Sequence, residues 1–389
     1  MKNMISELTI KNFKSIKDIT LSCKQVNIFV GKPNTGKSNI LEAISLLSGN
    51  VIFNNKFLDG VLYYENINDL FNMRDYSQPI YVKADSSAAQ VSFYPGDGMF
   101  GYYADNRATD SLTNVLGFSS SDDAYQHFVE EKHLAEDIVG KDAFNIGIRN
   151  LYKGQEFNGK ISHNSYFGAR IQRDGTVILP TSGIERISHV RSYHYKRQSG
   201  HGNPEIGYLL PPHGDNLLEV LRHTPALQEV VHDFFEPFGF DIVLILDNND
   251  GVNTIRIQKK YGAYHVQLPY SLVADTLQRM IFHLAAIYSN SDAVILLEEP
   301  EAHTYAPYQS YLAGEIIEDD QNQYFITTHS DHIFDSLLRP NPEKVAVFVV
   351  GYDDNNTTVR SLSDEEVTDN LNSYTSIFSN LEKYSMYET

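Results

Sequence analysis

Residues 31–38, with the sequence GKPNTGKS, match the pattern G-x-x-x-x-G-K-[ST]. In this pattern the two glycines let successive backbone N–H groups turn toward a phosphate, and the positive end of the following helix points at the same anion. Lys37 is placed to reach the β and γ phosphates of a nucleotide, and the Ser38 hydroxyl is placed to bind magnesium. A glycine turn that matches by chance is the alternative. The candidate nucleotide-binding residues of this segment are Gly31, Asn34, Thr35, Gly36, Lys37 and Ser38.

The sequence on both sides of this loop favours the phosphate-binding interpretation. Val26–Val30 (VNIFV) is a continuous apolar run, which is typical of a strand buried on both faces. After the loop, Ile40, Leu41, Ile44 and Leu47 recur at helical spacing, so a helix is expected to end at Gly49. A strand, a glycine loop and a helix in this order are the context that the pattern requires.

Carboxylates follow a second apolar run, in residues 295–301 (ILLEEPE). A strand that ends in acids places them at the carboxyl edge of a sheet, where a phosphate-binding loop also lies. We expect Glu298 to support a magnesium ion and Glu299 to take a proton from the attacking water. Because ATP brings about four negative charges to a site with Glu298, Glu299 and Glu301, we expect tight binding only with magnesium. A solvated acidic turn is the alternative.

A histidine follows a third apolar run. Tyr324–Thr328 is predicted to be a buried strand, and His329 comes directly after it. At that edge of the sheet the imidazole would hydrogen-bond the γ-phosphate or the attacking water. A structural histidine is the alternative. The candidate catalytic residues are therefore Lys37, Glu299 and His329.

Composition limits the class of protein. The 389 residues include 31 basic and 50 acidic side chains, a formal net charge of −19, which argues against nucleic-acid binding over the whole surface. Cys23 is the single cysteine, which excludes an internal disulfide framework. No run of about 18 apolar residues and no signal-peptide core is present, so we expect a soluble, cytoplasmic protein without a membrane partner.

The remaining sequence predicts further elements. Strands are expected at residues 78–83, 89–94 and 345–350, helices at 121–139 and from Thr224, a three-stranded meander at 241–268 and a short acidic helix after Asp364. Residues 186–201 are basic and aromatic within an acidic chain. This segment suits either nucleic-acid contact or a solvated strand with Tyr193 and Tyr195 packed inward.

Four of these segments together resemble a known family. The sequences LTIKNFKSI and GKPNTGKS near the N-terminus, then EEPEAH and TTHSDHIFD, look like the SMC/RecF/OLD-like branch of ABC-type ATPase heads in the family's order. The likeness covers about residues 1–80 and 265–350. It implies that two heads sandwich ATP and that each nucleotide also contacts the partner's signature motif. Ser271, in SLVADT, stands at the signature position but matches the family pattern poorly, and an ordinary N-capped helix is the alternative. The family commonly has Asp where Glu298 stands.

The resemblance implies an α/β fold, a P-loop ABC-type ATPase head with a mixed β-sheet and an inserted α+β subdomain. The expected divisions are 1–85 and 212–389 for the head and 86–211 for the insert. The expected cofactors are ATP and Mg²⁺, and the expected assembly is a homo-oligomer, at least a dimer.

The family also suggests roles. The head is similar to stand-alone ATPase subunits of bacterial anti-phage systems such as the PARIS ATPase, which implies a nucleotide-switched sensor or scaffold that holds a separate effector protein. A RecF-like DNA-binding repair ATPase is the alternative, disfavoured by the acidic net charge. An OLD-type nuclease is disfavoured because only about 60 residues follow His329.

Overall fold

The computed structural model describes residues 4–48, 52–53, 56–85, 87–96, 98–105, 166–180, 189–197, 207–245, 254–373 and 376–384. The predicted helix at 121–139 lies outside the described residues, as do the ends of the basic segment at 186–188 and 198–201. Within the described part, strands and helices alternate at the two ends of the chain, and the middle is mostly strand.

A six-stranded mixed sheet forms the centre of the molecule, in the order β11-β15-β16-β3-β17-β18. The first five strands run parallel, and β18 is antiparallel to β17. Its strands are β3 (Val26–Val30), β11 (Val190–Tyr193), β15 (Val294–Glu298), β16 (Gln323–Thr327), β17 (Val345–Asp353) and β18 (Asn356–Ser361). All five residues of β3 are buried, as its continuous apolar sequence predicts for a strand covered on both faces.

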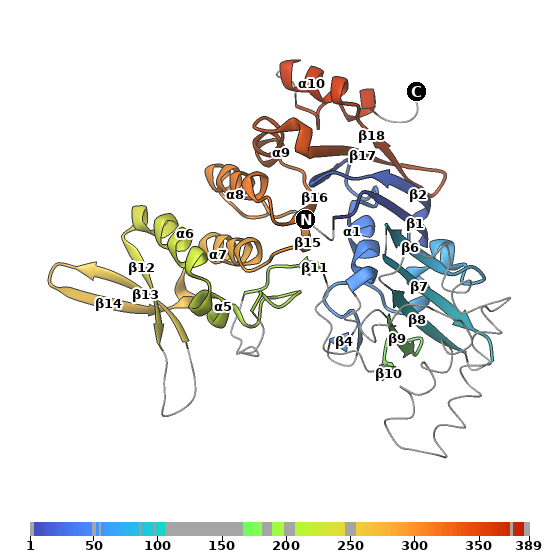
Figure 1. Ribbon diagram of the computed structural model, residues 1–389, viewed down its shortest axis with the longest axis horizontal. Helices are drawn as coiled ribbons and strands as arrows, with labels where there is room; N and C mark the ends of the chain where they lie inside the picture. Colours follow the sequence, from blue (N-terminus) through green and yellow to red (C-terminus); the bar gives the residue numbers. More distant parts are fainter. Residues whose placement is uncertain are drawn as a thin grey trace, which may run out of the picture.

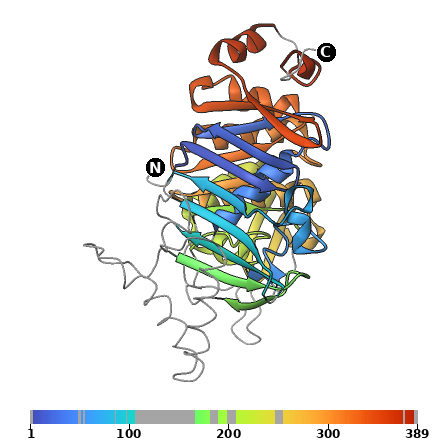
Figure 2. The same cartoon turned by 90° about the vertical axis from the view of Figure 1, so that its right-hand side faces the viewer.

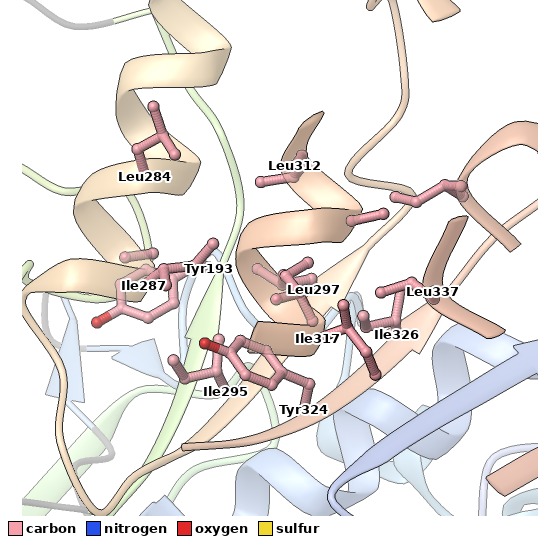
Figure 3. Close-up of a cluster of buried hydrophobic side chains, with 14 of the residues drawn as sticks. Tyr193, Leu284, Ile287, Ile295, Leu297, Leu312, Ile317, Tyr324, Ile326 and Leu337 are labelled. Atoms are coloured by element: carbon pink, nitrogen blue, oxygen red, sulfur yellow. The ribbon is translucent and has the colours of Figure 1, made fainter. Parts of the chain in front are cut away.

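Helices α7 (Asp275–Tyr288), α8 (Ala306–Glu318) and α9 (Asp331–Leu338) cover one face of this sheet, and α6 (Pro225–Phe235) packs against α7. The side chains that meet there alternate along each strand, as in Ile295 and Leu297 of β15, which face the helices while Leu296 faces the other way. Figure 3 shows this layer, with Tyr324 and Ile326 of β16 against Ile317 of α8. The helix predicted from Thr224 is confirmed as α6.

A second sheet and α1 (Lys37–Ser45) cover the opposite face. This antiparallel sheet has seven strands in the order β10-β9-β8-β7-β6-β1-β2 and is seen face-on in Figure 2. Its strands are β1 (Glu7–Phe13), β2 (Ile16–Ser22), β6 (Ile80–Ala84), β7 (Ser87–Tyr94), β8 (Met99–Asp105), β9 (Tyr166–Ile171) and β10 (Val177–Pro180). Helix α1 therefore lies between the two sheets (Figure 1).

Strands from the predicted insert extend both sheets. Strand β7 pairs with β6 in the antiparallel sheet, which β8 and β9 then continue. Strand β11 pairs with β15 in the central sheet. The divisions at 85/86 and 211/212 stay a prediction, because much of 86–211 lies outside the described residues.

The predicted meander forms a separate three-stranded sheet of β12 (Phe240–Ile245), β13 (Thr254–Tyr261) and β14 (Tyr264–Pro269). It lies beside α5 (Leu217–His223) and α6 at one end of the molecule, on the left of Figure 1. The acidic segment after Asp364 forms α10 (Asp364–Ser373), and β4 (Ile52–Phe53) and β5 (Lys56–Phe57) form a short hairpin. No described helix has the length and apolar character needed to cross a membrane.

Candidate nucleotide-binding site

The glycine loop joins the carboxyl end of β3 to α1 and is closed from one side by β17 and β18. Asn34 and Gly36 adopt left-handed backbone conformations, with φ of 60° and 96°. A Cβ at Gly31 would lie 2.3 Å from the Val350 carbonyl oxygen, and one at Gly36 would lie 2.0 Å from the Thr357 hydroxyl. Both glycines are thus required by close approach of the neighbouring strands, in addition to any phosphate that the loop holds.

Lys37 lies inside the loop. Its Nζ donates to the carbonyl oxygens of Gly31 at 3.1 Å and Lys32 at 2.8 Å, and only 6% of the residue is exposed. Burial lowers the Lys37 pKa, while the nearby Glu299 and Glu298 carboxylates oppose that shift. The ammonium group therefore sits where the loop backbone and the acids of β15 come together.

Of the neighbouring loop residues, one stabilises the loop and two are accessible to a ligand. Thr35 is buried; its hydroxyl donates to the Lys32 carbonyl at 2.9 Å, and its own carbonyl accepts from Thr357 at 2.9 Å. Thr35 thus stabilises the loop. Asn34 is exposed, and Ser38 is half-buried in the first turn of α1. These positions leave Asn34 and Ser38 accessible to a ligand.

The two acids and the histidine lie at the same edge of the central sheet. Glu298 of β15 pairs in register with Thr327 of β16, and Thr327 pairs with Phe29 of β3, so the three strands end together. The Glu299 Oε1 lies 3.4 Å from the His329 Nε2. The structure therefore brings the glycine loop, Glu298, Glu299 and His329 to one edge of the central sheet, as expected from the sequence.

Glu299 has a strained backbone, with φ of 41°. Left-handed conformations of this kind are uncommon outside glycine and are held by their surroundings. Here the Glu299 N–H donates to the Thr327 carbonyl at 3.0 Å, which fixes the turn. The carboxylate itself is 47% exposed, so a water molecule can reach it.

The surroundings of His329 favour its neutral form. Burial and the Lys37 ammonium lower its pKa, and Glu299 only partly opposes them. A neutral imidazole can both donate and accept a hydrogen bond. Its ring also lies 6.5 Å from that of Phe378, in the C-terminal segment.

Two further polar residues belong to this region, of which the first was missed and the second was expected in a different place. His194 follows β11, and its Nδ1 lies 3.8 Å from the Glu298 Oε2. The His194 Nε2 lies 2.9 Å from the Ser192 hydroxyl oxygen. Burial lowers the His194 pKa to about 4, so it is neutral. The second residue is Glu301, which is buried and accepts from the His329 N–H at 2.9 Å instead of facing the loop, contrary to our expectation of a third charge in the site.

The described part of the basic segment, residues 189–197, is partly buried, and nucleic-acid contact by the segment stays a prediction. Its described part includes β11, which is buried at the edge of the central sheet and not solvated. Tyr193 packs inward as expected, and Arg191 is buried with its guanidinium 3.5 Å from the Tyr208 ring centroid. These residues contribute to the core.

Ser271 belongs to the segment before α7 and not to the glycine loop. It is exposed in a short 3-10 turn, Tyr270–Leu272, between β14 and α7, and its carbonyl accepts from Arg197. Helix α7 packs on the face of the central sheet opposite α1 (Figure 1). The role of Ser271 stays a prediction.

Comparison with known proteins gives the fold. Residues 4–95 match a family model described as an AAA ATPase domain. Among solved structures, an Smc head bound to the C-winged helix domain of ScpA has 15% sequence identity and a TM-score of 0.50, with 94% of this chain and 99% of that chain covered. The chain has the fold of an SMC head. The expected α/β ABC-type ATPase head with a mixed sheet is thus confirmed.

Two further SMC heads are similar at lower scores. The head from Pyrococcus furiosus, with an extended coiled coil and bound to the C-terminal domain of ScpA, has 17% identity and a TM-score of 0.46, covering 95% of this chain and 98% of that one. The head from Thermotoga maritima has 10% identity and a TM-score of 0.37, covering 92% and 99%. A search of curated proteins finds no significant match.

Proposed function

We propose that the chain binds and hydrolyses ATP with the help of Mg²⁺. The observation that carries this proposal is the meeting of Lys37, Glu299 and His329 at the end of three adjacent parallel strands. The lysine supplies positive charge for the phosphates, Glu299 accepts a proton from water, and His329 hydrogen-bonds the γ-phosphate or that water. The match to an AAA ATPase domain over the loop supports the same activity.

The oxygen donors of the site suit magnesium. Mg²⁺ is commonly held by one or two protein oxygens, with phosphate and water completing its shell. Ser38 at the start of α1 and Glu298 at the end of β15 supply such oxygens. Among the described residues no three His, Cys, Asp or Glu side chains gather into a metal cluster, so a site completed by phosphates is the arrangement that fits. The ion would neutralise phosphate charge beside Glu298 and Glu299.

We propose that two copies of the chain together form the complete nucleotide site. Ser271 and the start of α7 are exposed, and we propose that a second copy brings them to the nucleotide of the first. Burying ATP between two copies would give the bound and hydrolysed states different interfaces, so that ATP acts as a switch.

We propose that this switch holds or releases a separate effector protein in the cytoplasm, in anti-phage defence. This role rests on the resemblance to stand-alone defence ATPases.

DNA binding is the second candidate function. One observation favours it: β13 and β14 carry Arg256, Lys259 and Lys260 without an acidic residue, in a chain of net charge −19. A salt titration of duplex DNA binding decides between the two. Binding that persists at physiological salt supports the repair-type function, and binding that is absent there supports the effector-holding function.

Phosphate release tests the ATPase proposal. We expect Lys37→Ala to abolish nucleotide binding and Glu299→Gln to bind ATP but lower kcat by about 10²-fold or more. Two exposed residues away from the site provide matched controls: Lys11→Ala on β1 and Glu318→Gln at the end of α8 should keep wild-type rates. Wild-type turnover by Glu299→Gln would show that another group is the base.

A further inference from the structure

The Glu301 carboxylate lies behind the site and not in it. Only 8% of the residue is exposed, and its Oε1 accepts from the Thr328 hydroxyl at 2.7 Å and from the His329 N–H at 2.9 Å. Glu301 belongs to the loop after β15, whereas Thr328 and His329 follow β16. One side chain therefore joins the loop that carries Glu299 to the turn that carries His329.

A ring of hydrogen bonds surrounds this link. The Thr328 hydroxyl accepts from the Ser330 N–H at 3.0 Å, and the Ser330 hydroxyl donates to the Gln309 Oε1 at 2.6 Å. The Gln309 amide then donates to the Thr304 carbonyl at 3.1 Å, and the Thr304 N–H donates to the Glu301 carbonyl at 3.0 Å. The ring passes through two loops and α8, and it closes on Glu301.

This ring adds a side-chain link between two parts of the site whose backbones already meet, because the Glu299 N–H donates to the Thr327 carbonyl. Glu299, with its strained backbone, starts the loop, and the Ala302 N–H donates to its carbonyl at 2.9 Å. The Glu299 and His329 side chains are 3.4 Å apart and both are more than a third exposed, so packing alone does not fix them. Their separation depends on the backbone segments that Glu301 ties together.

We propose that Glu301 is a positioning residue that sets the geometry between Glu299 and His329. This inference rests on the proposed ATPase function. Glu301 acts through the His329 backbone, to which its Oε1 is hydrogen-bonded. Misplacement of reacting groups by about 1 Å lowers rates by about 10²-fold in other enzymes.

Glu301→Ala removes both hydrogen bonds, whereas Glu301→Gln keeps an oxygen that can accept them. We expect the alanine variant to lower kcat by about 10- to 100-fold. We expect KM and the equilibrium Kd for ATP to stay within about twofold, because the glycine loop is untouched. The glutamine variant should recover kcat to within about threefold of wild type. A purely structural role for Glu301 would not produce this split or this rescue.

Glu219 on α5 provides the matched control. Its carboxylate is similarly buried, with 9% of the residue exposed, and it lies on a helix that takes no part in the site. Glu219→Ala should lower the melting temperature while leaving kcat at the wild-type value. A fall in kcat for Glu219→Ala equal to that for Glu301→Ala would overturn the proposal.

Amide hydrogen exchange provides a test that does not depend on turnover. Without nucleotide, residues 328–332 should exchange at least about tenfold faster in Glu301→Ala than in wild type, and at the wild-type rate in Glu301→Gln. Unchanged exchange in the alanine variant would overturn the proposal. If the wild-type chain hydrolyses no ATP, the proposed function fails, and this exchange experiment still decides whether Glu301 orders the turn.

Thr328→Val gives a second variant in case Glu301→Ala does not fold. The substitution is nearly isosteric and removes one of the two donors to Glu301. We expect a kcat loss of about threefold to tenfold at constant KM, with faster exchange at Ser330, whose N–H loses its acceptor. An unchanged kcat together with unchanged exchange would contradict the proposal.

Discussion

Alanine at Gly36 tests the close approach of β18 to the glycine loop. The left-handed backbone, with φ of 96°, costs a residue with a Cβ about 1–2 kcal/mol. The new Cβ would also lie 2.0 Å from the Thr357 hydroxyl. That hydroxyl bonds the Thr35 carbonyl at 2.9 Å and the Ser15 hydroxyl at 2.5 Å. Displacing it from both partners costs about 1 kcal/mol each, so we expect Gly36→Ala to destabilise the fold by about 3–4 kcal/mol.

A double-mutant cycle with Thr357→Ala separates these contributions. Thr357→Ala alone should cost about 1–2 kcal/mol, because it leaves the buried Thr35 carbonyl without its donor. In the double variant the hydroxyl clash is gone, and the backbone strain and the contacts with the Ser15 hydroxyl at 2.7 Å and the residue-357 Cβ at 3.2 Å remain. The free energies of unfolding from urea titration should therefore fall short of additivity by about 1–2 kcal/mol. Additive values, or a Gly36→Ala variant as stable as wild type, would refute the packing that we describe.

Three other predictions concern charge. Burial lowers the His283 pKa to about 3, so as pH falls below 6.5 this histidine takes up a proton in the unfolded chain before it does so in the folded one, and stability is lost. His283→Leu should therefore reduce the loss of stability that urea titrations measure between pH 6.5 and pH 4. An unchanged pH dependence would contradict this. The Lys32–Glu382 pair, 2.9 Å apart, is largely exposed and therefore screened by solvent, so Glu382→Gln should leave the urea midpoint almost unchanged. Because the His329 pKa lies below its ordinary value, phosphate release should stay constant from pH 8 to pH 7 and fall only at more acidic pH; a fall that begins above pH 7 would exclude this assignment.

Much of the site was predictable because it lies at the ends of buried strands. The apolar runs before Gly31, Glu299 and His329 each predict a strand, and parallel strands end at a common edge. At these three positions, a residue type suited to nucleotide chemistry directly follows an apolar run that predicts a strand. No knowledge of the strand order was needed to expect them together.

His194, which was missed, and Glu301, whose position was predicted wrongly, both depend on contacts between distant parts of the chain. His194 lies beside Glu298 because β11 pairs with β15, about a hundred residues later, and a four-residue strand rich in polar side chains gives no clear pattern. Glu301 belongs to an acidic run, and acidic residues are rarely buried. Its burial depends on the turn at Thr328, which only the folded chain brings beneath it.

Equilibrium binding of ATP to the Glu299→Gln variant tests the central claim most directly, because binding is then measured without turnover. We predict tight binding with Mg²⁺, strong weakening by a chelator, and loss of binding when Lys37→Ala is added. An affinity that neither the chelator nor the loss of the Lys37 ammonium changes would contradict a triphosphate site between the glycine loop and the acids of β15.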